Sequence, residues 1–522
     1  MSDQATFQQQ IKEGYTFKGR FINLGGAMLN GEVVPEANVR LPLKMMNRHG
    51  LIAGATGSGK TKTLQILAEQ LSLQGVPVLL MDVKGDLSGI AVPSEGHPKI
   101  DERHEKIGIP FDAGSSPVEF LTLSDEKGAR LRATVTEFGP VLFSKILELS
   151  DTQSGIVSVL FKYCDDNELA LLDLEDFKKV LQYSTGDGKK DIEAEYGRIS
   201  TVSANTILRK IVELEQQGAD RFFGETSFDV QDLLRTKDGK GIVSILRLTD
   251  IQDKPKLFST FMLQMLAEVY ATFPEEGDLE QPKLVVFIDE AHLVFDEASK
   301  ALLDQIEAIV KLIRSKGVGL YFVTQNPTDI PDEVLSQLGL KMQHALRAFT
   351  AKDRKAIKLA AQNYPDSEHY DTATLLTELG IGEALVTTLN EKGIPTPLAH
   401  TMLRAPQSRM DVLTDAEIDK IINQSEVIDK YNEAINRESA YEILSGKMEE
   451  AQEAEHNEKM DKQKKKARST KAEKSTMEKV VSNTTTRQIG RTVARELTRG
   501  LLGVLGIKTT TRRRSRKKTG WF

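Results

Sequence analysis

Eight residues near the start of the chain have the types and spacing of a phosphate-binding loop. Residues 54–61 read GATGSGKT and fit the pattern G-x-x-x-x-G-K-[ST] at every position. Glycines let the backbone curl so that successive N–H groups point at phosphate oxygens, and a following helix adds its positive N-terminal end. Lys60 is expected to reach the β- and γ-phosphates of ATP, and the Thr61 hydroxyl to coordinate Mg²⁺. The predicted ATP-binding residues are Gly54, Ala55, Thr56, Gly57, Ser58, Gly59, Lys60, Thr61 and Lys62.

A pair of carboxylates follows the apolar run LVVFI at residues 284–288. A buried strand would deliver Asp289 and Glu290 to its C-terminal end, where parallel sheets bind their ligands. Asp289 is expected to hold Mg²⁺ directly or through water, and Glu290 to orient and polarise the attacking water. A protein that only binds nucleotide, or a small-molecule kinase, has less need of the second acid. The pair therefore favours hydrolysis of ATP.

Two further polar segments end apolar runs. Gln325, in TQNP at residues 324–327, could sense the γ-phosphate, although Asn-Pro also forms plain turns. The segment DVKGD at residues 82–86 could contact nucleotide or a neighbouring subunit, or could be a simple turn.

An arginine from a neighbouring subunit can stabilise the charge on a phosphoryl group during transfer. Arg314, in VKLIRSKGVGL, is the first candidate for this role, and Arg347, in HALRAF, is the second. Either side chain could instead form a surface ion pair.

The elements that must position these residues alternate along the chain. Apolar runs bounded by turn residues are typical of buried parallel strands, and helical periodicity lies between them. This alternation predicts an α/β fold with a parallel sheet. The predicted strands are 49–54, 76–82, 241–248, 283–290 and 319–326, with helices at 61–75 and 298–317.

Seven segments follow from this pattern. Between the two parts of the core, several short helical segments indicate an insertion that serves packing, or acts as a lid or partner-binding element. The expected segments are a short N-terminal β element (1–46), the first part of the ATPase core (47–140), the helical insertion (141–240), the second part of the core (241–406), a helical segment (407–445), a charged linker or solvated helix (446–486) and a basic tail (487–522).

The composition and the absence of targeting signals indicate the cellular compartment of the protein. The 522 residues include a single cysteine, Cys164, which excludes an intramolecular disulfide and favours a reducing compartment. Histidines show no metal-ligand spacing, so no zinc site is predicted. The N-terminus lacks the pattern of a secretory signal, and no uncharged apolar run approaches the roughly 20 residues that span a bilayer. We therefore expect a cytoplasmic protein without integral membrane insertion.

The tail has the opposite charge to the body. Residues 487–522 hold eleven Arg or Lys and one acid, whereas the whole chain carries a net charge of −7. A mobile cationic arm suits the phosphate backbone of DNA. It also suits an anionic membrane surface, with Trp521 and Phe522 at the interface, or serves solubility alone. The candidate nucleic-acid-binding residues are Arg487, Arg491, Arg495, Arg499, Arg512, Arg513 and Arg514.

Five segments in order, HGLIAGATGSGKTKT, LLMDVKGD, VVFIDEAH, YFVTQNP and LRAFTAKDRKAI, resemble the HerA/FtsK superfamily of P-loop ATPases, and most closely its bacterial HerA-like branch. The resemblance covers roughly residues 17–405. It implies a RecA-like core of the additional-strand catalytic-glutamate type, a hexamer with ATP at subunit interfaces, and movement of DNA or protein through a central pore. By position, Lys60 and Thr61 match the phosphate loop, Asp289 and Glu290 the acidic pair, and Gln325 the sensor. Arg314 matches the approximate place of the arginine supplied to the neighbouring subunit.

Two features of the superfamily are missing from the sequence. The residues before His49 are too few for the complete N-terminal β-barrel of HerA, and the membrane spans of FtsK have no counterpart. The sequence thus predicts a hexameric ATPase motor, a translocase or helicase-like enzyme acting on DNA. The alternatives are a motor that moves polypeptide in a secretion or assembly system, and an ATP-dependent switch or scaffold that moves nothing.

Overall fold

The computed structural model describes residues 3–250, 254–277, 279–295, 300–433, 435 and 437–477. Residues 1–448 form one compact unit and residues 449–522 a second one. All seven arginines of the predicted nucleic-acid-binding tail lie outside the described residues. No helix in the described ranges is both long and apolar enough to cross a membrane.

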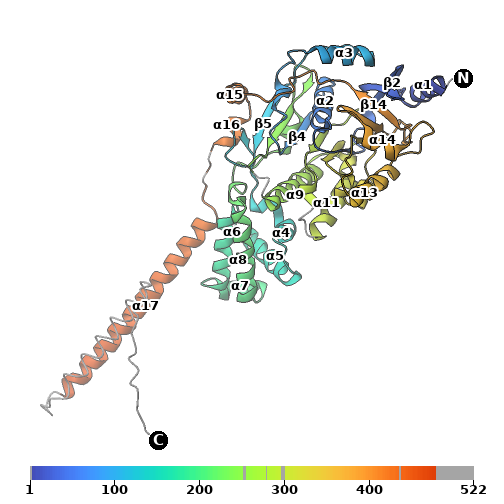
Figure 1. Ribbon diagram of the computed structural model, residues 1–522. Coiled ribbons are helices and arrows are strands. Elements are labelled where there is room, and N and C mark those ends of the chain that lie inside the picture. The colour runs from blue at the N-terminus through green and yellow to red at the C-terminus, as the bar shows by residue number, and fades with distance from the viewer. Residues whose placement is uncertain are drawn as a thin grey trace, which may run out of the picture. The chain divides into compact units, whose positions relative to one another are not determined.

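A twelve-stranded sheet organises the first unit (Figure 1). Its central strands are parallel, as the alternating pattern predicts, and all five expected strands are among them. The fold class is confirmed: a largely parallel sheet flanked by helices. In spatial order the parallel strands are β12 (Leu340–Gln343), β3 (Gly50–Ala53), β11 (Val318–Thr324), β10 (Leu284–Ile288), β4 (Val78–Asp82), β9 (Val243–Arg247), β5 (Val118–Thr122) and β6 (Ala129–Arg130).

Antiparallel strands extend the sheet beyond β12. They are β13 (Glu383–Thr387), β14 (Ala399–Leu403), β1 (Phe21–Leu29) and β2 (Glu32–Pro42). Where a short N-terminal β element is expected, residues 21–42 form a hairpin of two strands. The hairpin belongs to the main sheet through pairing with β14, and a helix, α1 (Asp3–Gly14), precedes it.

Helices cover both faces of the sheet because successive strand residues point to opposite faces. Leu51, Leu79 and Val286 belong to one hydrophobic cluster, which includes α9 (Pro255–Thr272) and α11 (Lys300–Ile313). The neighbouring residues Ile52 and Leu80 belong to the other cluster, which includes α1 and α2 (Lys60–Leu73). The sheet is thus buried on both sides, and its strand ends remain available for a site.

Five helices form the insertion, which lies at the lower part of Figure 1. They begin at residue 135, slightly before the expected boundary, and precede β9 in the chain although β9 pairs between β4 and β5. Whether the insertion acts as a lid stays a prediction. The helices are α4 (Val135–Ile146), α5 (Asp151–Asp166), α6 (Leu174–Thr185), α7 (Lys189–Tyr196) and α8 (Thr201–Gln216).

The remaining helices are short except for the last one. Within the expected charged segment 446–486, the structure describes a continuous helix as far as residue 477. These helices are α3 (Pro98–Ile107), α10 (His292–Phe295), α12 (Asp332–Leu335), α13 (Ala351–Gln362), α14 (Thr372–Glu378), α15 (Asp415–Ile422), α16 (Ile428–Asn432) and α17 (Ala440–Met477).

Candidate functional site

The phosphate-binding loop lies at the carboxyl end of β3 and leads into the N-terminus of α2. Gly54, Gly57 and Gly59 have φ values of 153°, 77° and 111°, which residues with a Cβ rarely adopt. A Cβ on Gly54 would also lie 2.5 Å from the Cβ of His344. Lys60 is buried, and its ammonium group donates hydrogen bonds to the carbonyls of Gly54 and Ala55. Burial lowers the pKa of Lys60, as does the charge of Lys84.

Residues just after β12 form hydrogen bonds with the phosphate-binding loop and with α2. The backbone N–H of Ala55 donates to the carbonyl of Ala345 at 2.7 Å. His344 is fully buried, and its Nε2 lies 2.9 Å from the Thr63 hydroxyl in the first turn of α2. Burial lowers the pKa of His344 to about 4, so the ring is neutral near pH 7. Sequence reasoning did not single out His344, because nothing local to residue 344 indicates contact with a loop almost 290 positions earlier.

Asp289 and Glu290 follow β10 directly, and both are 5% exposed. Their strand lies between β11 and β4, close to the phosphate-binding loop in the sheet order. Burial raises the pKa of Asp289 to about 7, although the charge of Lys84 opposes that shift. Glu290 has φ +46°, a left-handed conformation that is unusual for a residue other than glycine. Such backbone outliers occur preferentially at functional sites.

A lysine in the turn after the neighbouring strand β4 pairs with the Glu290 carboxylate. The Lys84 ammonium forms an ion pair with Oε1 of Glu290, and Nδ1 of His292 lies 3.2 Å from Oε2. Burial alone would raise the pKa of Glu290, but its hydrogen bond and charge interaction with Lys84 outweigh burial and lower that pKa. The ion pair with Lys84 thus keeps Glu290 ionised, the form that can accept a proton.

The loop that carries Lys84 is shaped by Asp82. The Asp82 carboxylate accepts hydrogen bonds from the backbone N–H groups of Gly85 at 2.7 Å, Asp86 at 3.2 Å and Leu87 at 3.1 Å. These bonds fix the turn after β4. Residues 82–86 form a turn that places a cation at the acidic pair, and their contact with nucleotide or a neighbouring subunit stays a prediction. Sequence reasoning gave Lys84 itself no role.

Gln325 follows β11 and contacts Thr56 of the phosphate-binding loop. The Thr56 hydroxyl donates to Oε1 of Gln325 at 3.5 Å, the long limit of a hydrogen bond. The next turn, η6 (Pro327–Asp329), is held by Asp329, whose carboxylate accepts from the Thr324 hydroxyl at 2.6 Å and from the N–H of Asn326 at 3.1 Å. A side chain in this position can respond to what the loop binds.

Neither candidate arginine forms a hydrogen bond or ion pair with the described residues of this cluster. Arg314 lies in the turn before β11, whereas Gln325 follows the other end of that seven-residue strand, about 20 Å away at the rise of a strand. Arg347 donates to the carbonyl of Thr377 at 3.2 Å. The roles of both residues stay predictions.

An apolar cavity of about 390 Å³ adjoins the phosphate-binding loop. It lies beside α2 and is closed on one side by Arg103, which donates to the carbonyls of Gly382 at 3.2 Å and Leu403 at 3.0 Å. Its volume and apolar wall suit a nucleobase next to a phosphate site. Among its lining residues are Gly59, Lys62, Ile66, Ile100, Ile381 and Met410.

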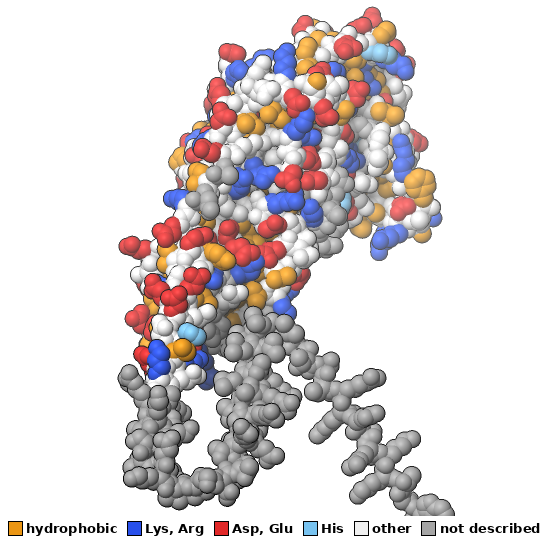
Figure 2. Space-filling view, turned by 90° about the vertical axis from the view of Figure 1, so that its left-hand side faces the viewer, with side chains coloured by type: hydrophobic (Ala, Val, Ile, Leu, Met, Phe, Trp, Pro, Cys, Tyr) orange, Lys and Arg blue, Asp and Glu red, His pale blue; other side chains and the backbone are white. Residues whose placement is uncertain are grey.

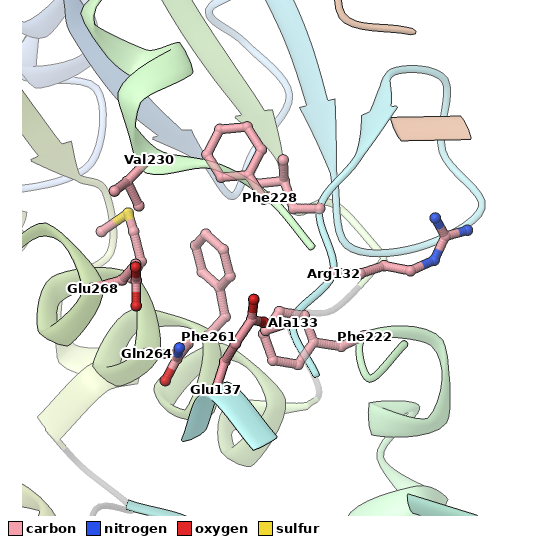
Figure 3. A pocket seen from close by; sticks show the side chains of 11 residues that line it. Arg132, Ala133, Glu137, Phe222, Phe228, Val230, Phe261, Gln264 and Glu268 are labelled. Carbon is pink, nitrogen blue, oxygen red and sulfur yellow. The ribbon is translucent and has the colours of Figure 1, made fainter. Parts of the chain in front are cut away.

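A second cavity lies between the helical insertion and α9 (Figure 3). Phe222, Phe228 and Phe261 line it, and the Arg132 side chain points away from it. At about 50 Å³ it has room for a water molecule or two and not for a nucleotide. It therefore belongs to the packing of the insertion.

A protein-family model described as "Helicase HerA-like C-terminal" matches residues 28–510. The chain belongs to this family. The superfamily resemblance of its five motif segments is thereby confirmed.

Individual relatives are more distant. The chain is 26% identical over 359 residues to "DNA double-strand break repair helicase HerA" of Sulfurisphaera tokodaii, which covers 67% of this chain and 64% of the relative. It is 27% identical over 391 residues to a probable helicase of Methanocaldococcus jannaschii, covering 68% of this chain and 66% of the relative. The chain therefore spans just under two thirds of the length of these HerA-like proteins.

A solved structure shares the fold. The "bacterial conjugative coupling protein TrwBdeltaN70" superposes with a TM-score of 0.50 at 15% identity, covering 78% of this chain and 95% of that chain. At this identity the similarity concerns the HerA-like core fold alone.

Proposed function

We propose that this HerA-like protein hydrolyses ATP with Mg²⁺ and uses the energy to move along DNA as a ring of identical subunits, most simply a hexamer. The observation that carries the ATPase part is the meeting of the phosphate-binding loop, Asp289, Glu290 and Gln325 at one edge of the sheet. They come from the ends of three strands, β3, β10 and β11, and no packing requirement would place two buried carboxylates there.

The donor set fits a magnesium ion. The Thr61 hydroxyl and the Asp289 carboxylate are hard oxygen donors, which Mg²⁺ prefers together with phosphate oxygens and water. Asp289 is almost fully buried and forms no ion pair with a described residue, because the nearby Lys84 pairs with Glu290 instead. A bound divalent cation would keep Asp289 ionised and would neutralise charge on the phosphates.

The protein side chains supply positioning and electrostatics. Lys60 exchanges the carbonyls of Gly54 and Ala55 for the phosphates, and backbone N–H groups of the loop donate to the same oxygens. The apolar cavity beside α2 receives the base, where Arg103 and Ile381 form its outer wall. Glu290 orients a water molecule toward the terminal phosphorus, and Gln325 contacts that phosphate next to Thr56.

Two observations support the ring and its substrate. Arg314 is too far from the site of its own chain to act there, so the proposal assigns the arginine that stabilises phosphoryl transfer to a neighbouring copy. The relative in Sulfurisphaera tokodaii is described as a helicase of DNA double-strand break repair, which favours DNA as the polymer.

The test is the steady-state rate of ATP hydrolysis with Mg²⁺, with and without double-stranded DNA. Glu290→Gln should lower kcat by about 10²–10⁴-fold, the usual contribution of a positioned general base, while ATP still binds. The exposed Glu168→Gln serves as the matched control and should leave kcat unchanged. A wild-type protein that hydrolyses no ATP would overturn the proposed activity. A rate that ignores DNA would overturn DNA as the substrate and point to a polypeptide or to a switch.

A further inference from the structure

The helix that follows β12 gathers positive charge that the described part of the chain does not neutralise. Its exposed cations are Lys352, Arg354, Lys355 and Lys358, and none of the four forms an ion pair with another described residue. Asp353 is the one acid in this stretch, and its carboxylate is used in the capping box with Thr350. Elsewhere many lysines are paired, as in Lys311 with Glu307 and Lys430 with Asp232.

Two of these cations lie at the end of the helix where positive charge is unfavourable. Lys352 and Arg354 lie in the first turn of α13, at the positive end of the helix dipole. Cations there repel the partial charge of the unpaired backbone N–H groups, and this lowers the stability of the helix. A bound anion would reverse the sign of both interactions.

An aromatic ring stands beside the cations. Phe349, in the loop just before α13, is 86% exposed, the largest exposure among the large hydrophobic residues of the described chain. Leu359 on the same helix is 46% exposed. Cations next to an exposed aromatic ring are the combination that binds a nucleic acid strand, through phosphates and through stacking on a base.

The surface of α13 is connected to the nucleotide site. α13 contacts η6, the turn that follows Gln325. Asp329 in η6 is hydrogen-bonded to Thr324 and Asn326 on either side of Gln325, and Gln325 contacts Thr56 of the phosphate-binding loop. A ligand that shifts α13 therefore acts on the sensor through one intervening turn.

Charge is distributed differently on the face drawn in Figure 2. There Lys and Arg side chains are interspersed with Asp and Glu side chains. Long-range attraction of a polyanion requires one sign of charge over a continuous surface, so this mixed face is less suited to DNA than the α13 surface.

We propose that Phe349 and the cations of α13 form a contact site for the phosphodiester backbone of DNA, and that η6 transmits occupancy of this site to Gln325. This inference rests on the proposed function, in which DNA is the polymer moved.

The test uses the full chain and a charge-matched control. The α13 variant carries Lys352→Glu, Lys355→Glu and Lys358→Glu, and the control carries Lys18→Glu, Lys190→Glu and Lys392→Glu, three exposed lysines on other elements that form no ion pair with a described residue. Both variants change the net charge by the same amount, and both keep the tail. Affinity for single- and double-stranded oligonucleotides is measured by fluorescence anisotropy at several salt concentrations, together with the ATPase rate and the size of the assembly.

The α13 variant should bind DNA less tightly, and the slope of log K against log salt should become less steep by about 2 to 3, at roughly 0.9 for each phosphate that the protein no longer neutralises. Its basal ATPase rate should stay unchanged while stimulation by DNA disappears. Phe349→Ala should weaken binding of single-stranded DNA by roughly ten-fold, the effect expected for one stacked base. The control should retain both the slope and the stimulation.

Three results would overturn the α13 site. The slope and the stimulation could survive in the α13 variant, the control could be impaired as much as the α13 variant, or the α13 variant could change only the size of the assembly. The last result would assign α13 to contact with a neighbouring subunit. A wild type that hydrolyses ATP without responding to DNA would instead refute the proposed polymer, and the α13 site with it.

Discussion

The backbone of Glu290 allows a direct test of whether the site stores strain. Glu290→Gly and Glu290→Ala both remove the carboxylate and its ion pair with Lys84, so they differ only in the Cβ atom. A left-handed conformation costs a residue with a Cβ about 1–2 kcal/mol, and the extra freedom of glycine in the unfolded chain returns about 0.5–1 kcal/mol. At φ +46°, Glu290→Gly should therefore be roughly 1 kcal/mol more stable than Glu290→Ala.

The assay is equilibrium unfolding by urea, and Glu168 provides the matched pair. Glu168 has φ +55°, is exposed, and lies in the helical insertion away from the acidic pair. The free energy of unfolding of Glu168→Gly should exceed that of Glu168→Ala by a similar amount. Both Glu168 variants should keep full ATPase activity. Both Glu290 variants should lose turnover. The reasoning fails if Glu290→Gly is no more stable than Glu290→Ala while Glu168→Gly is more stable than Glu168→Ala. That result would show that Glu290 does not hold the left-handed conformation in solution.

Three other predictions concern the surroundings of the site. Lys84→Met should lower the free energy of unfolding by about 1–3 kcal/mol, less than the loss of a fully buried pair, because the Lys84 side chain is 36% exposed. In a double-mutant cycle with Glu290→Gln, this destabilisation should vanish once the carboxylate is gone. Glu69 is 2% exposed, and burial raises its pKa to about 7 from an ordinary 4.5, so the folded protein holds a proton that the unfolded chain releases between these values. The stability contributed by protonated Glu69 is therefore fully present below pH 4.5 and is lost as the pH rises through 7, by roughly 3 kcal/mol in total. The free energy of unfolding of wild type and of Glu69→Gln is measured at pH 5 and pH 8. An equal difference between the two proteins at both pH values would contradict the prediction. Ile381→Asp places a carboxylate at the rim of the apolar cavity and should raise the Kd for ATP roughly ten-fold in a titration with a fluorescent analogue, whereas Ile394→Asp, at another exposed isoleucine, should not.

The central strands and the phosphate-binding loop were predictable because their signals are local. Each strand is a short apolar run between turn residues, and the loop pattern stands between one such run and a periodic helix. The acidic pair follows from the same logic, since a strand that ends in Asp289 and Glu290 delivers both to the sheet edge. Local pattern is enough wherever a site is built from strand ends of a parallel sheet.

The N-terminal helix also has a local signal in the sequence. Phe7, Ile11 and Tyr15 recur every four residues, the spacing of one helix face, and all three are at most 1% exposed. No local pattern indicates against which part of the protein these side chains pack. The Tyr15 hydroxyl donates to the carbonyls of Val386 at 3.0 Å and Pro397 at 2.7 Å, so the helix is fixed by strands more than 370 residues away.

The same limit explains the missed site residues. Lys84 and His344 act through side chains that meet the site only after β4 and β12 take their places on either side of it in the sheet. A lysine in a turn and a histidine at a strand end have many ordinary uses. Their roles depend on strand order, and strand order is a property of the folded sheet.

Strand direction also bears on assembly. Because the parallel strands run the same way, every group that follows a strand lies at the nucleotide edge, and every group that precedes one lies at the opposite edge. Arg314 precedes β11, so no rearrangement of its side chain brings it to Gln325 of the same chain. In the proposed ring, the opposite edge of one subunit is the surface that a neighbour can present to the nucleotide. A catalytic arginine on that edge would make each subunit inactive alone, so turnover would depend on contact between subunits, the condition that a motor needs to act in sequence around a ring.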